Sequence, residues 1–193
     1  LGLADFAADE ELWSVVRLSE VRAAGRIDAE YFQPKYERLF EQLKRRDARP
    51  LDELVTMKKG TEPGSEVYQE EGRPFIRVSS ISKFGLSNKD QKSITEQLYK
   101  ELKDSYRPKV DEILLTKDAT LGIAYVLKEK IEGIVSGGVL RLKLREKIDA
   151  EYLALCINST VGQLQAERDA GGSIIAHWRP EQIKQVQIPI LPE

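Results

Sequence analysis

The sequence predicts an α+β domain: a mixed or antiparallel sheet with flanking helices, preceded by an N-terminal helical arm. Apolar and amphipathic segments follow one another in the order strands, helix, strands, helices, strand. Two short apolar segments, Glu112–Thr116 and Gly122–Leu127, flank a small polar loop at Lys117–Leu121, which is typical of paired strands. Val139–Leu144 alternates strictly, which predicts a strand with its leucines on one face and with Arg141 and Lys143 on the other.

Length and composition set broad limits. At 193 residues the chain is long enough for one domain with an appendage, or for two small domains. The net charge of -2 neither indicates nor excludes a nucleic-acid partner. No apolar segment approaches the roughly 20 residues that cross a bilayer, and no signal peptide is present. The single cysteine, Cys156, fits a reducing cytoplasm. The first residue, Leu1, is not a methionine, which indicates a piece of a longer protein.

The arm contains the first clear helical pattern. Residues 12–18 are read as a short strand or a turn of helix, and Pro34 suits a first helical turn. The stripe that follows has the spacing i, i+3, i+4 and i+7 and consists of Tyr36, Leu39, Phe40 and Leu43. Two uses of this stripe stay open: packing against the chain's own body, or contact with a partner helix as in a coiled coil. We place the lead-in and arm at residues 1–48 and the main domain at residues 49–193.

Local signals predict the elements of the main domain. Ser93 and Glu96 have capping-box spacing, which predicts a helix from about Ile94 to Lys103. Asp149 has the side chain to cap a helix through about Asn158. The other expected elements are a strand at Arg73–Val78, a helix at about Val161–Arg168, a turn opened by Pro180 and a closing segment at Val186–Pro189, with polar loops at 58–64 and 79–85.

No constellation in the sequence predicts an active site. Glycine motifs that cradle phosphates are absent, and one histidine with one cysteine does not make a clustered metal site. Cys156 lies on the apolar side of a predicted helix, so an inert thiol is expected there and not a catalytic pair with His177. Glu101 and Lys103 have the local spacing of a nuclease pair, but they lie on a predicted surface helix. The sequence therefore favours a non-catalytic binding module.

Basic residues concentrate in the centre of the chain. From Arg73 to Lys117 there are ten Lys and Arg against six Asp and Glu, whereas the first 53 residues hold twelve acids against nine bases. The central cations recur beside Ser, Thr, Asn and Gln, the side chains that contact phosphates or read base edges. The plain alternative is a set of solvated loops, as on any soluble α+β domain.

Several motifs in order resemble a known family. Over about residues 50–192 the chain resembles one target recognition domain of the DNA specificity (S) subunits of type I restriction-modification systems. The lead-in Arg26–Phe32 and its helix also resemble the approach to such domains. The segments that carry the resemblance are Pro50–Val55 with Lys58–Gly60, Pro74–Ile81, Asp111–Thr116 with Gly122, Asp149–Leu153 with Asn158 and Ser159, Gly172 through His177, and Ile188–Pro192.

The chain departs from the family pattern in two ways. The family commonly has glycine where this chain has Val110 or Asp111 and where it has Ala119, so the turn at these positions does not follow from the resemblance. A complete S subunit usually carries two recognition domains separated by long helices, whereas this chain carries one. It therefore resembles a half subunit, an excised part of a longer chain, or the recognition end of a fused methyltransferase–nuclease.

The resemblance implies a function and its partners. The chain would bind double-stranded DNA sequence-specifically, read one half of a bipartite site and position an adenine methyltransferase subunit. It would have no catalytic activity and no cofactor: S-adenosylmethionine, and ATP with Mg in some assemblies, would belong to the methyltransferase and restriction subunits. The arm would pack against a second recognition domain. Two alternatives remain, the recognition domain of a fused type II restriction–methylation enzyme and a protein-interaction domain that never contacts DNA.

The candidate DNA contacts follow the polar loops. Arg77 lies in a predicted strand, where an internal salt bridge is its alternative role, and Trp178 is assigned to the core. Phosphates would repel Asp118, so we expect it to brace its loop in preference to accepting from a cytosine amino group. Expected phosphate contacts are Lys58, Lys59, Lys83 and Lys89. The other candidates are Thr61, Arg77, Ser79, Ser80, Lys117, Thr120, Ser173 and His177.

Overall fold

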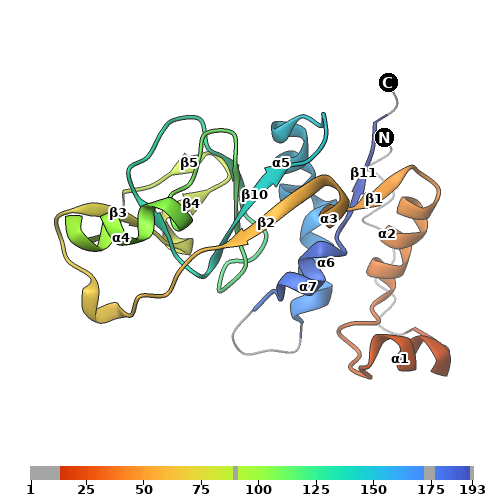
Figure 1. The fold of residues 1–193 in the computed structure, drawn as a ribbon. Helices are drawn as coiled ribbons and strands as arrows, with labels where there is room; N and C mark the ends of the chain where they lie inside the picture. The colour runs from red at the N-terminus through yellow and green to blue at the C-terminus, as the bar shows by residue number, and fades with distance from the viewer. Residues whose placement is uncertain (1–13, 89–90, 172–176, 192–193) are drawn as a thin grey trace.

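A four-stranded antiparallel sheet lies at the centre of the fold (Figure 1). The computed structural model describes residues 14–88, 91–171 and 177–191. The strand order is β2-β10-β7-β8, and β7 and β8 form the hairpin that the sequence predicts. The bounds of these strands are β2 Val55–Lys59, β7 Ile113–Thr116, β8 Ala124–Val126 and β10 Val139–Leu144.

One face of the central sheet is covered by helices. Leu140 and Leu142 of β10 lie opposite Leu115 and Ile113 of β7, and all four side chains enter the largest core. The helices that complete this core are α3 (Leu51–Leu54), α5 (Ala150–Asn158), α6 (Thr160–Ala170) and α7 (Pro180–Lys184). Trp178 is fully buried in the same core, as the sequence predicts.

The other face is covered by a smaller, mixed sheet. In it β3 (Arg73–Ile76) pairs antiparallel with β6 (Lys92–Ile94) and parallel with β9 (Ile134–Val135). Alternation along β3 sends Ile76 toward the central sheet and Phe75 toward α4 (Glu96–Tyr106). The α+β class with mixed and antiparallel pairing is therefore confirmed. The hairpin of β4 (Ile81–Ser82) and β5 (Gly85–Leu86) contacts β8, and its Ile81 enters the same core as Ile76.

The arm packs against the chain's own body. Helix α2 (Pro34–Lys44) contacts α6, and Tyr36, Leu39 and Leu43 are 3 to 5% exposed. The first of the two uses left open for the stripe is thus the observed one. The predicted boundary at residue 48 falls in β1 (Ala48–Pro50), which pairs with β11 (Gln187–Pro189). The short helix α1 (Leu18–Ala24) has no buried residue.

Two helix caps test the sequence signals. Asp149 caps α5 as predicted, because its side chain accepts a hydrogen bond from the Tyr152 backbone N–H at 2.9 Å. Helix α4 begins later than predicted, and its cap is Thr95, which accepts from the Leu98 N–H at 3.1 Å. The prediction for Ser93 is wrong because its backbone N–H and carbonyl already bond to Gln69, which places Ser93 in β6.

The alternation of β10 holds, but one of its outward residues is buried. Lys143 is exposed, whereas Arg141 is only 4% exposed. The Arg141 guanidinium donates to the carbonyl oxygens of Ser105, at 2.7 Å, and Arg107 at the end of α4. Carbonyl groups at a helix C-terminus lack partners within the helix, so they can accept bonds from an arginine brought in from a neighbouring strand.

Candidate nucleic-acid interface

Several loops meet beside the central sheet. We call residues 60–62, 77–80, 117–121 and 136–138, together with His177, the loop cluster. Backbone hydrogen bonds join its parts: the Gly137 N–H donates to the Thr61 carbonyl at 2.9 Å and the Lys117 N–H to the Gly138 carbonyl at 3.0 Å. The Trp178 N–H donates to the Lys117 carbonyl at 2.8 Å, which attaches the segment after the 172–176 gap. Polar residues distant in sequence therefore lie on one frame.

Two glycines permit this close approach of the loops. A Cβ atom added at Gly60 would lie 2.1 Å from the Ser136 carbonyl oxygen. At Gly138 it would lie 2.9 Å from a methyl group of Val78. A side chain at Gly60 would displace the backbone of residues 135–136, and one at Gly138 would have to move the Val78 side chain. These glycines therefore help to determine how tightly the loop cluster closes.

Asp118 braces the loop cluster, as the sequence analysis expects. One of its carboxylate oxygens lies 2.7 Å from Lys117 Nζ, and the other contacts His177 Nδ1. The Lys117 side chain is 3% exposed, against 33% for Asp118 and 53% for His177. Lys117, expected at an exposed tip, is instead buried, because its backbone bonds to Gly138 and Trp178 on both sides and draws the residue inward.

The remaining candidates of the loop cluster differ in exposure. Ser79, Thr120 and His177 are exposed, and Thr61 and Arg77 are half-buried. Ser80 is 2% exposed, and its hydroxyl accepts a hydrogen bond from the Arg77 backbone N–H at 3.3 Å. In this arrangement Ser80 supports the loop from inside, and the exposed residues carry the polar groups that a ligand can reach.

Two residues beside the β7–β8 hairpin have left-handed backbone conformations. Asp111 has φ of 68° and Ala119 has φ of 58°. These are positions where the chain departs from the glycine of the family pattern. Side chains with a Cβ rarely adopt this conformation, and alanine lacks the polar atoms that help aspartate tolerate it. The turn is therefore kept without glycine, at a cost in backbone energy at Ala119.

Three of the four predicted phosphate-binding lysines lie within the described residues. Lys58 and Lys59 are exposed on the edge strand β2, and neither forms an ion pair within the described part of the chain. Lys83 is exposed on the β4–β5 hairpin. Lys89 and Ser173 lie outside the described residues. An alternative role for lysines on an edge strand is to prevent pairing with another sheet.

Several basic residues of the central stretch form ion pairs with carboxylates of the same chain. Arg73 pairs with Glu96 at 2.5 Å, Lys92 with Glu70 at 2.8 Å, and Arg107 with Glu132 at 3.3 Å. Together with Lys117, at least four of the ten cations counted in the sequence have a carboxylate partner within the described part of the chain. A count of charges along the sequence overstates what is available to an anionic ligand.

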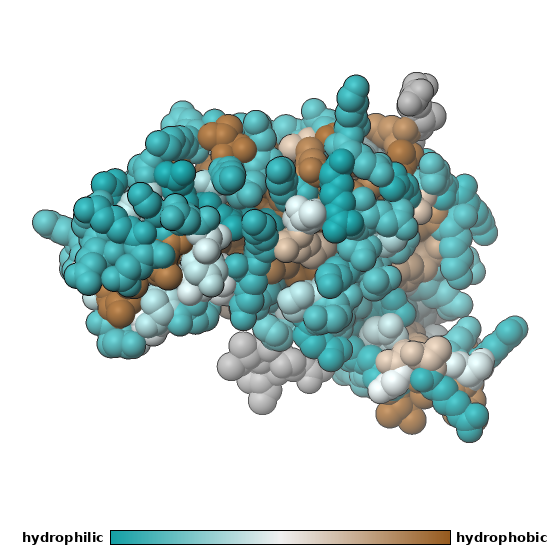
Figure 2. All heavy atoms as spheres, in the orientation of Figure 1, coloured by the Kyte–Doolittle hydropathy of each residue, from teal (hydrophilic) through white to brown (hydrophobic). Residues whose placement is uncertain are grey.

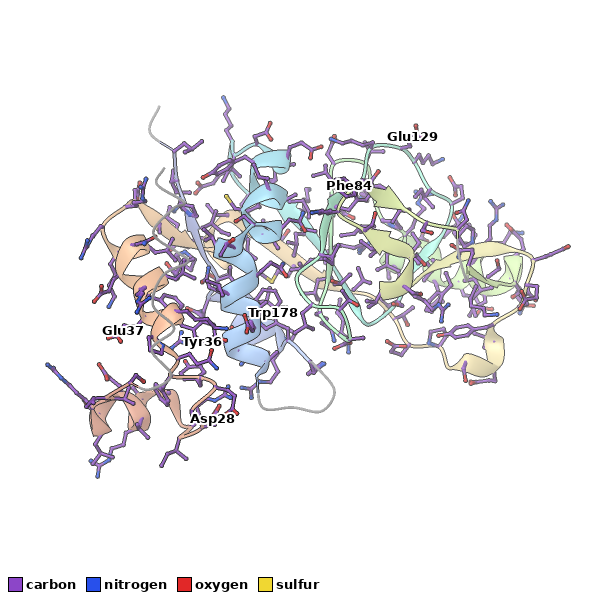
Figure 3. All side chains as sticks on the ribbon, turned by 180° about the vertical axis from the view of Figure 1, so that it is seen from behind. Asp28, Tyr36, Glu37, Phe84, Glu129 and Trp178 are labelled. Carbon is purple, nitrogen blue, oxygen red and sulfur yellow. The ribbon has the colours of Figure 1, made fainter. Side chains whose placement is uncertain are left out.

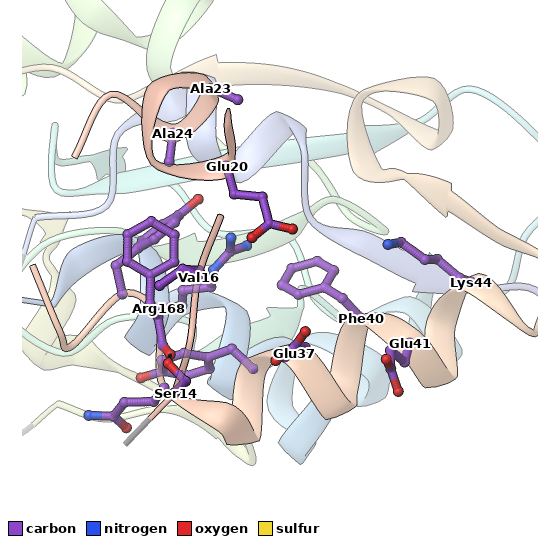
Figure 4. Close-up of a pocket in the computed structure, with 14 residues that line it drawn as sticks. Ser14, Val16, Glu20, Ala23, Ala24, Glu37, Phe40, Glu41, Lys44 and Arg168 are labelled. Atoms are coloured by element: carbon purple, nitrogen blue, oxygen red, sulfur yellow. Dashed lines mark hydrogen bonds between the residues drawn. The ribbon is translucent and has the colours of Figure 1, made fainter. Parts of the chain in front are cut away.

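A pocket lies apart from the loop cluster, between α1 and α2 (Figure 4). Its volume is about 440 Å³, and its lining includes Glu20, Glu37 and Glu41. The Arg168 guanidinium lies between two aromatic rings of the lining, 4.0 Å from the Tyr31 centroid and 4.6 Å from that of Phe40. Three carboxylates around its lining would repel phosphates, so we do not include this pocket in the candidate interface.

The described residues offer little other chemistry. Among the residues that the structure describes, no group of three or more His, Cys, Asp and Glu is placed to hold a metal ion. Cys156 lies in the largest core, where burial raises the pKa of its thiol, and His177 contacts Asp118. No helix in the described ranges is long and apolar enough to span a membrane.

Comparison with known proteins identifies the family. The sequence model described as "Type I restriction modification DNA specificity domain" matches residues 47–193, which is most of the chain. The chain belongs to this family. The resemblance inferred from the ordered motifs is thereby confirmed, and the loop cluster lies entirely within the matched part of this DNA specificity domain. No curated protein matches the chain.

Solved structures share the fold of the specificity domain. The S subunit of the type I restriction-modification system from M. genitalium matches with a TM-score of 0.52 and 17% identity, over 74% of this chain and 33% of that one. The HsdS subunit from Thermoanaerobacter tengcongensis matches with 0.51 and 16%, over 90% and 43%. The type IIG restriction endonuclease BpuSI matches with 0.59 and 10%, over 91% and 28%. The chain thus spans less than half the length of each.

Proposed function

We propose that this specificity domain binds duplex DNA, reads one half of a bipartite site and thereby positions an adenine methyltransferase subunit. The observation that carries the proposal is the family match across residues 47–193, which includes every loop of the loop cluster. Hydroxyl and imidazole groups such as those of Ser79, Thr120 and His177 can donate to or accept from base edges. Because they are exposed on a hydrogen-bonded frame, they are preorganised for this task.

The proposal divides the work between this chain and its partners. This chain supplies binding and orientation alone. Methyl transfer would use S-adenosylmethionine held by the methyltransferase subunit, and restriction would use ATP and Mg held by a further subunit. We propose the cytoplasm as the compartment, in line with the single cysteine.

Salt dependence tests the proposed phosphate contacts. Each phosphate neutralised by a lysine contributes about 0.9 to the slope of log K against log salt concentration. The variant Lys58→Ala/Lys59→Ala should therefore bind all duplexes more weakly, with a slope that is smaller by about 2. Fluorescence anisotropy with random duplex DNA at several salt concentrations measures both effects. Lys44→Ala is the matched control, since Lys44 is an exposed lysine of the arm.

The same measurement can overturn the proposal. Absence of salt-dependent DNA binding, by the chain alone and with a methyltransferase subunit, would leave the protein-interaction alternative. Unchanged slopes in the double variant, with wild-type binding intact, would reassign Lys58 and Lys59 to protection of the sheet edge.

We propose that the arm contacts a second recognition domain through the residues around α1. Tyr36, Leu39 and Leu43 of the α2 stripe are already buried, whereas the side chains around α1 are open: Val15, Leu18 and Ile27 are 87, 63 and 85% exposed. Figure 2 shows hydrophobic residues at the end of the molecule where α1 lies. Val15→Ser/Leu18→Ser should weaken assembly with a second domain, measured by analytical ultracentrifugation. An unchanged association constant would contradict this contact.

A fused type II restriction–methylation enzyme is the second candidate. The fold likeness to BpuSI favours it as much as the likeness to type I subunits favours the first. Recognition by the loop cluster would be the same in both. Sequencing of the coding region that precedes this chain decides between them, because methyltransferase motifs in the same reading frame indicate the fused enzyme.

A further inference from the structure

The β4–β5 hairpin carries an aromatic side chain that the fold does not bury. Lys83 and Phe84 form the two-residue turn between the paired residues Ser82 and Gly85. Phe84 is 86% exposed at the tip of this hairpin (Figure 3). Burial of such a side chain would contribute about 1.5–3 kcal/mol, and none of this is gained here. The stability of the domain therefore does not explain a phenylalanine at this position.

The ring is held on a firm support. Ile81 and Leu86, which pair at the base of the hairpin, pack in the core that also contains Ile76 and Val139. At the tip, the Ser82 hydroxyl donates to the Gly85 carbonyl at 2.8 Å and accepts from the Phe84 N–H at 3.3 Å. The hairpin also follows directly on residues 77–80 of the loop cluster. A rigid mount of this kind loses little conformational entropy when the ring binds a partner.

The segment that carries Phe84 is basic. Residues 72–89 contain four Lys and Arg and no Asp or Glu. Lys83 Nζ lies 5.0 Å from the centroid of the Phe84 ring, and Lys83 is exposed. An apolar ring beside a cation, without a carboxylate in the same segment, suits a base stack flanked by phosphates.

We propose that Phe84 is a wedge residue: its ring enters part-way between two adjacent base pairs of the bound duplex while Lys83 contacts the neighbouring phosphate. This proposal rests on the DNA-binding function proposed above and adds a mode of recognition to it. Apolar side chains that enter a base step kink the duplex, and the cost of the kink depends on the step. Phe84 thus makes the domain sensitive to the deformability of a step whose base edges it does not read.

The test uses a duplex selected from a random library by the chain with its methyltransferase subunit. With 2-aminopurine placed at successive steps outside the methylated adenine, wild-type protein raises the fluorescence at one step, because the base there is unstacked. Phe84→Ala abolishes this rise and weakens binding to the selected duplex about tenfold. Binding to random duplexes changes less than about twofold, since it depends on phosphate contacts.

Three further variants make the result specific. Phe84→Leu retains part of the fluorescence rise, because leucine also serves as a wedge. Lys83→Ala weakens binding to selected and random duplexes alike. Leu155→Ala removes another exposed apolar side chain, 65% exposed on α5, and leaves both affinities unchanged.

The outcomes separate the two proposals. Selective DNA binding by wild-type protein, with wild-type affinity and fluorescence in Phe84→Ala, overturns the wedge and leaves the proposed function standing. A wild-type complex that binds no DNA overturns the proposed function, and the wedge with it.

Discussion

Asp118 Oδ2 lies 2.7 Å from Lys117 Nζ, and this ion pair joins two consecutive residues of which one is buried and the other half-exposed. The lysine is 3% exposed, and the Asp118 carboxylate is the charged partner of its ammonium. The carboxylate also contacts His177, so the pair connects the interior of the loop cluster to its surface. Asp118 therefore positions the His177 ring, and Lys117 contributes by holding Asp118 in place.

Loss of Asp118 should destabilise the domain more than loss of Lys117. Asp118→Ala leaves the buried Lys117 ammonium without a partner and should destabilise the domain by about 2–3 kcal/mol. Lys117→Met should cost less, because the side-chain volume is retained and Asp118 can still be solvated. The double variant should recover part of the loss, which urea denaturation of all four proteins measures. A larger loss for Lys117→Met than for Asp118→Ala would contradict this account.

Glycine at position 119 should stabilise the protein. Ala119 has φ of 58°, a conformation that costs an L-residue roughly 1–2 kcal/mol. Glycine removes this strain, but its greater entropy in the unfolded chain offsets part of the gain. We therefore expect Ala119→Gly to raise the free energy of unfolding by about 0.5–1 kcal/mol. Ala154→Gly in the middle of α5 is the control and should lower it by about 1 kcal/mol. Equal losses in both variants would show that strain at Ala119 is absent.

The buried Arg141 should be sensitive to substitution. Its guanidinium donates to the carbonyl oxygens of Ser105 and Arg107 and lies 3.9 Å from the buried Glu112 carboxylate. Arg141→Met leaves these acceptors without their partner and should cost about 2 kcal/mol or more. Arg141→Lys should restore little, because one ammonium does not reproduce the two-pronged geometry of guanidinium. Lys143→Met, two residues along β10 and exposed, should change stability by less than about 0.5 kcal/mol. Thermal or urea unfolding distinguishes these expectations.

The stability of the domain should contain a contribution from Asp169 that decreases as the pH rises. Burial raises the pKa of this carboxyl above 3.8, although the Trp178 N–H, 3.1 Å away, and nearby arginines oppose the shift. The native state therefore binds the proton more tightly than the unfolded state does. The contribution is fully present below pH 3.8 and is lost as the pH rises through the native pKa. The free energy of unfolding of wild type, relative to that of Asp169→Asn, should therefore decrease as the pH rises above 3.8. Urea titrations at successive pH values measure this difference.

Glu132 should show the opposite dependence. Hydrogen bonds from Lys130 and Tyr99, with Arg107 nearby, lower the pKa of its carboxyl from 4.5 to about 2. Its contribution is thus present above pH 4.5 and is lost as the pH falls toward 2. The stability of wild type relative to Glu132→Gln should decrease on acidification through this window. A difference that stays constant with pH would show that the carboxylate is not held in the native state.

Elements with strong local signals could be predicted from the sequence. The stripe of α2, the Asp149 cap of α5 and the alternation of β10 all correspond to observed elements, because propensity, capping and periodicity act within a few residues. Ser93 shows the limit of such signals. Its capping-box spacing is genuine in sequence, but pairing with Gln69 from a distant segment takes its backbone groups first.

The sequence indicates which loops form the candidate site but not which of their side chains are buried. The sequence indicates the polar loops that meet in the loop cluster and the bracing role of Asp118, because an acid among expected phosphate contacts is conspicuous. The sequence does not indicate that Lys117 and Ser80 are buried while Thr120 and His177 are exposed. The exposure of the Phe84 ring does not follow from the sequence either, where the available signal is an apolar residue between Lys83 and Gly85.

The sequence by itself determined the family, the α+β class and the order of most elements, since each depends on short patterns or on their succession. Only the tertiary structure decided which charges lie inside. Lys117 is buried because Gly138 and Trp178 bond to its backbone, and Arg141 because the end of α4 offers carbonyl groups. A charged group can be buried only where a partner satisfies it, and for the Lys117 ammonium that partner is the adjacent Asp118. The backbone bonds that hold Lys117 inside, and the carbonyl groups that accept from Arg141, come from residues more than twenty positions away.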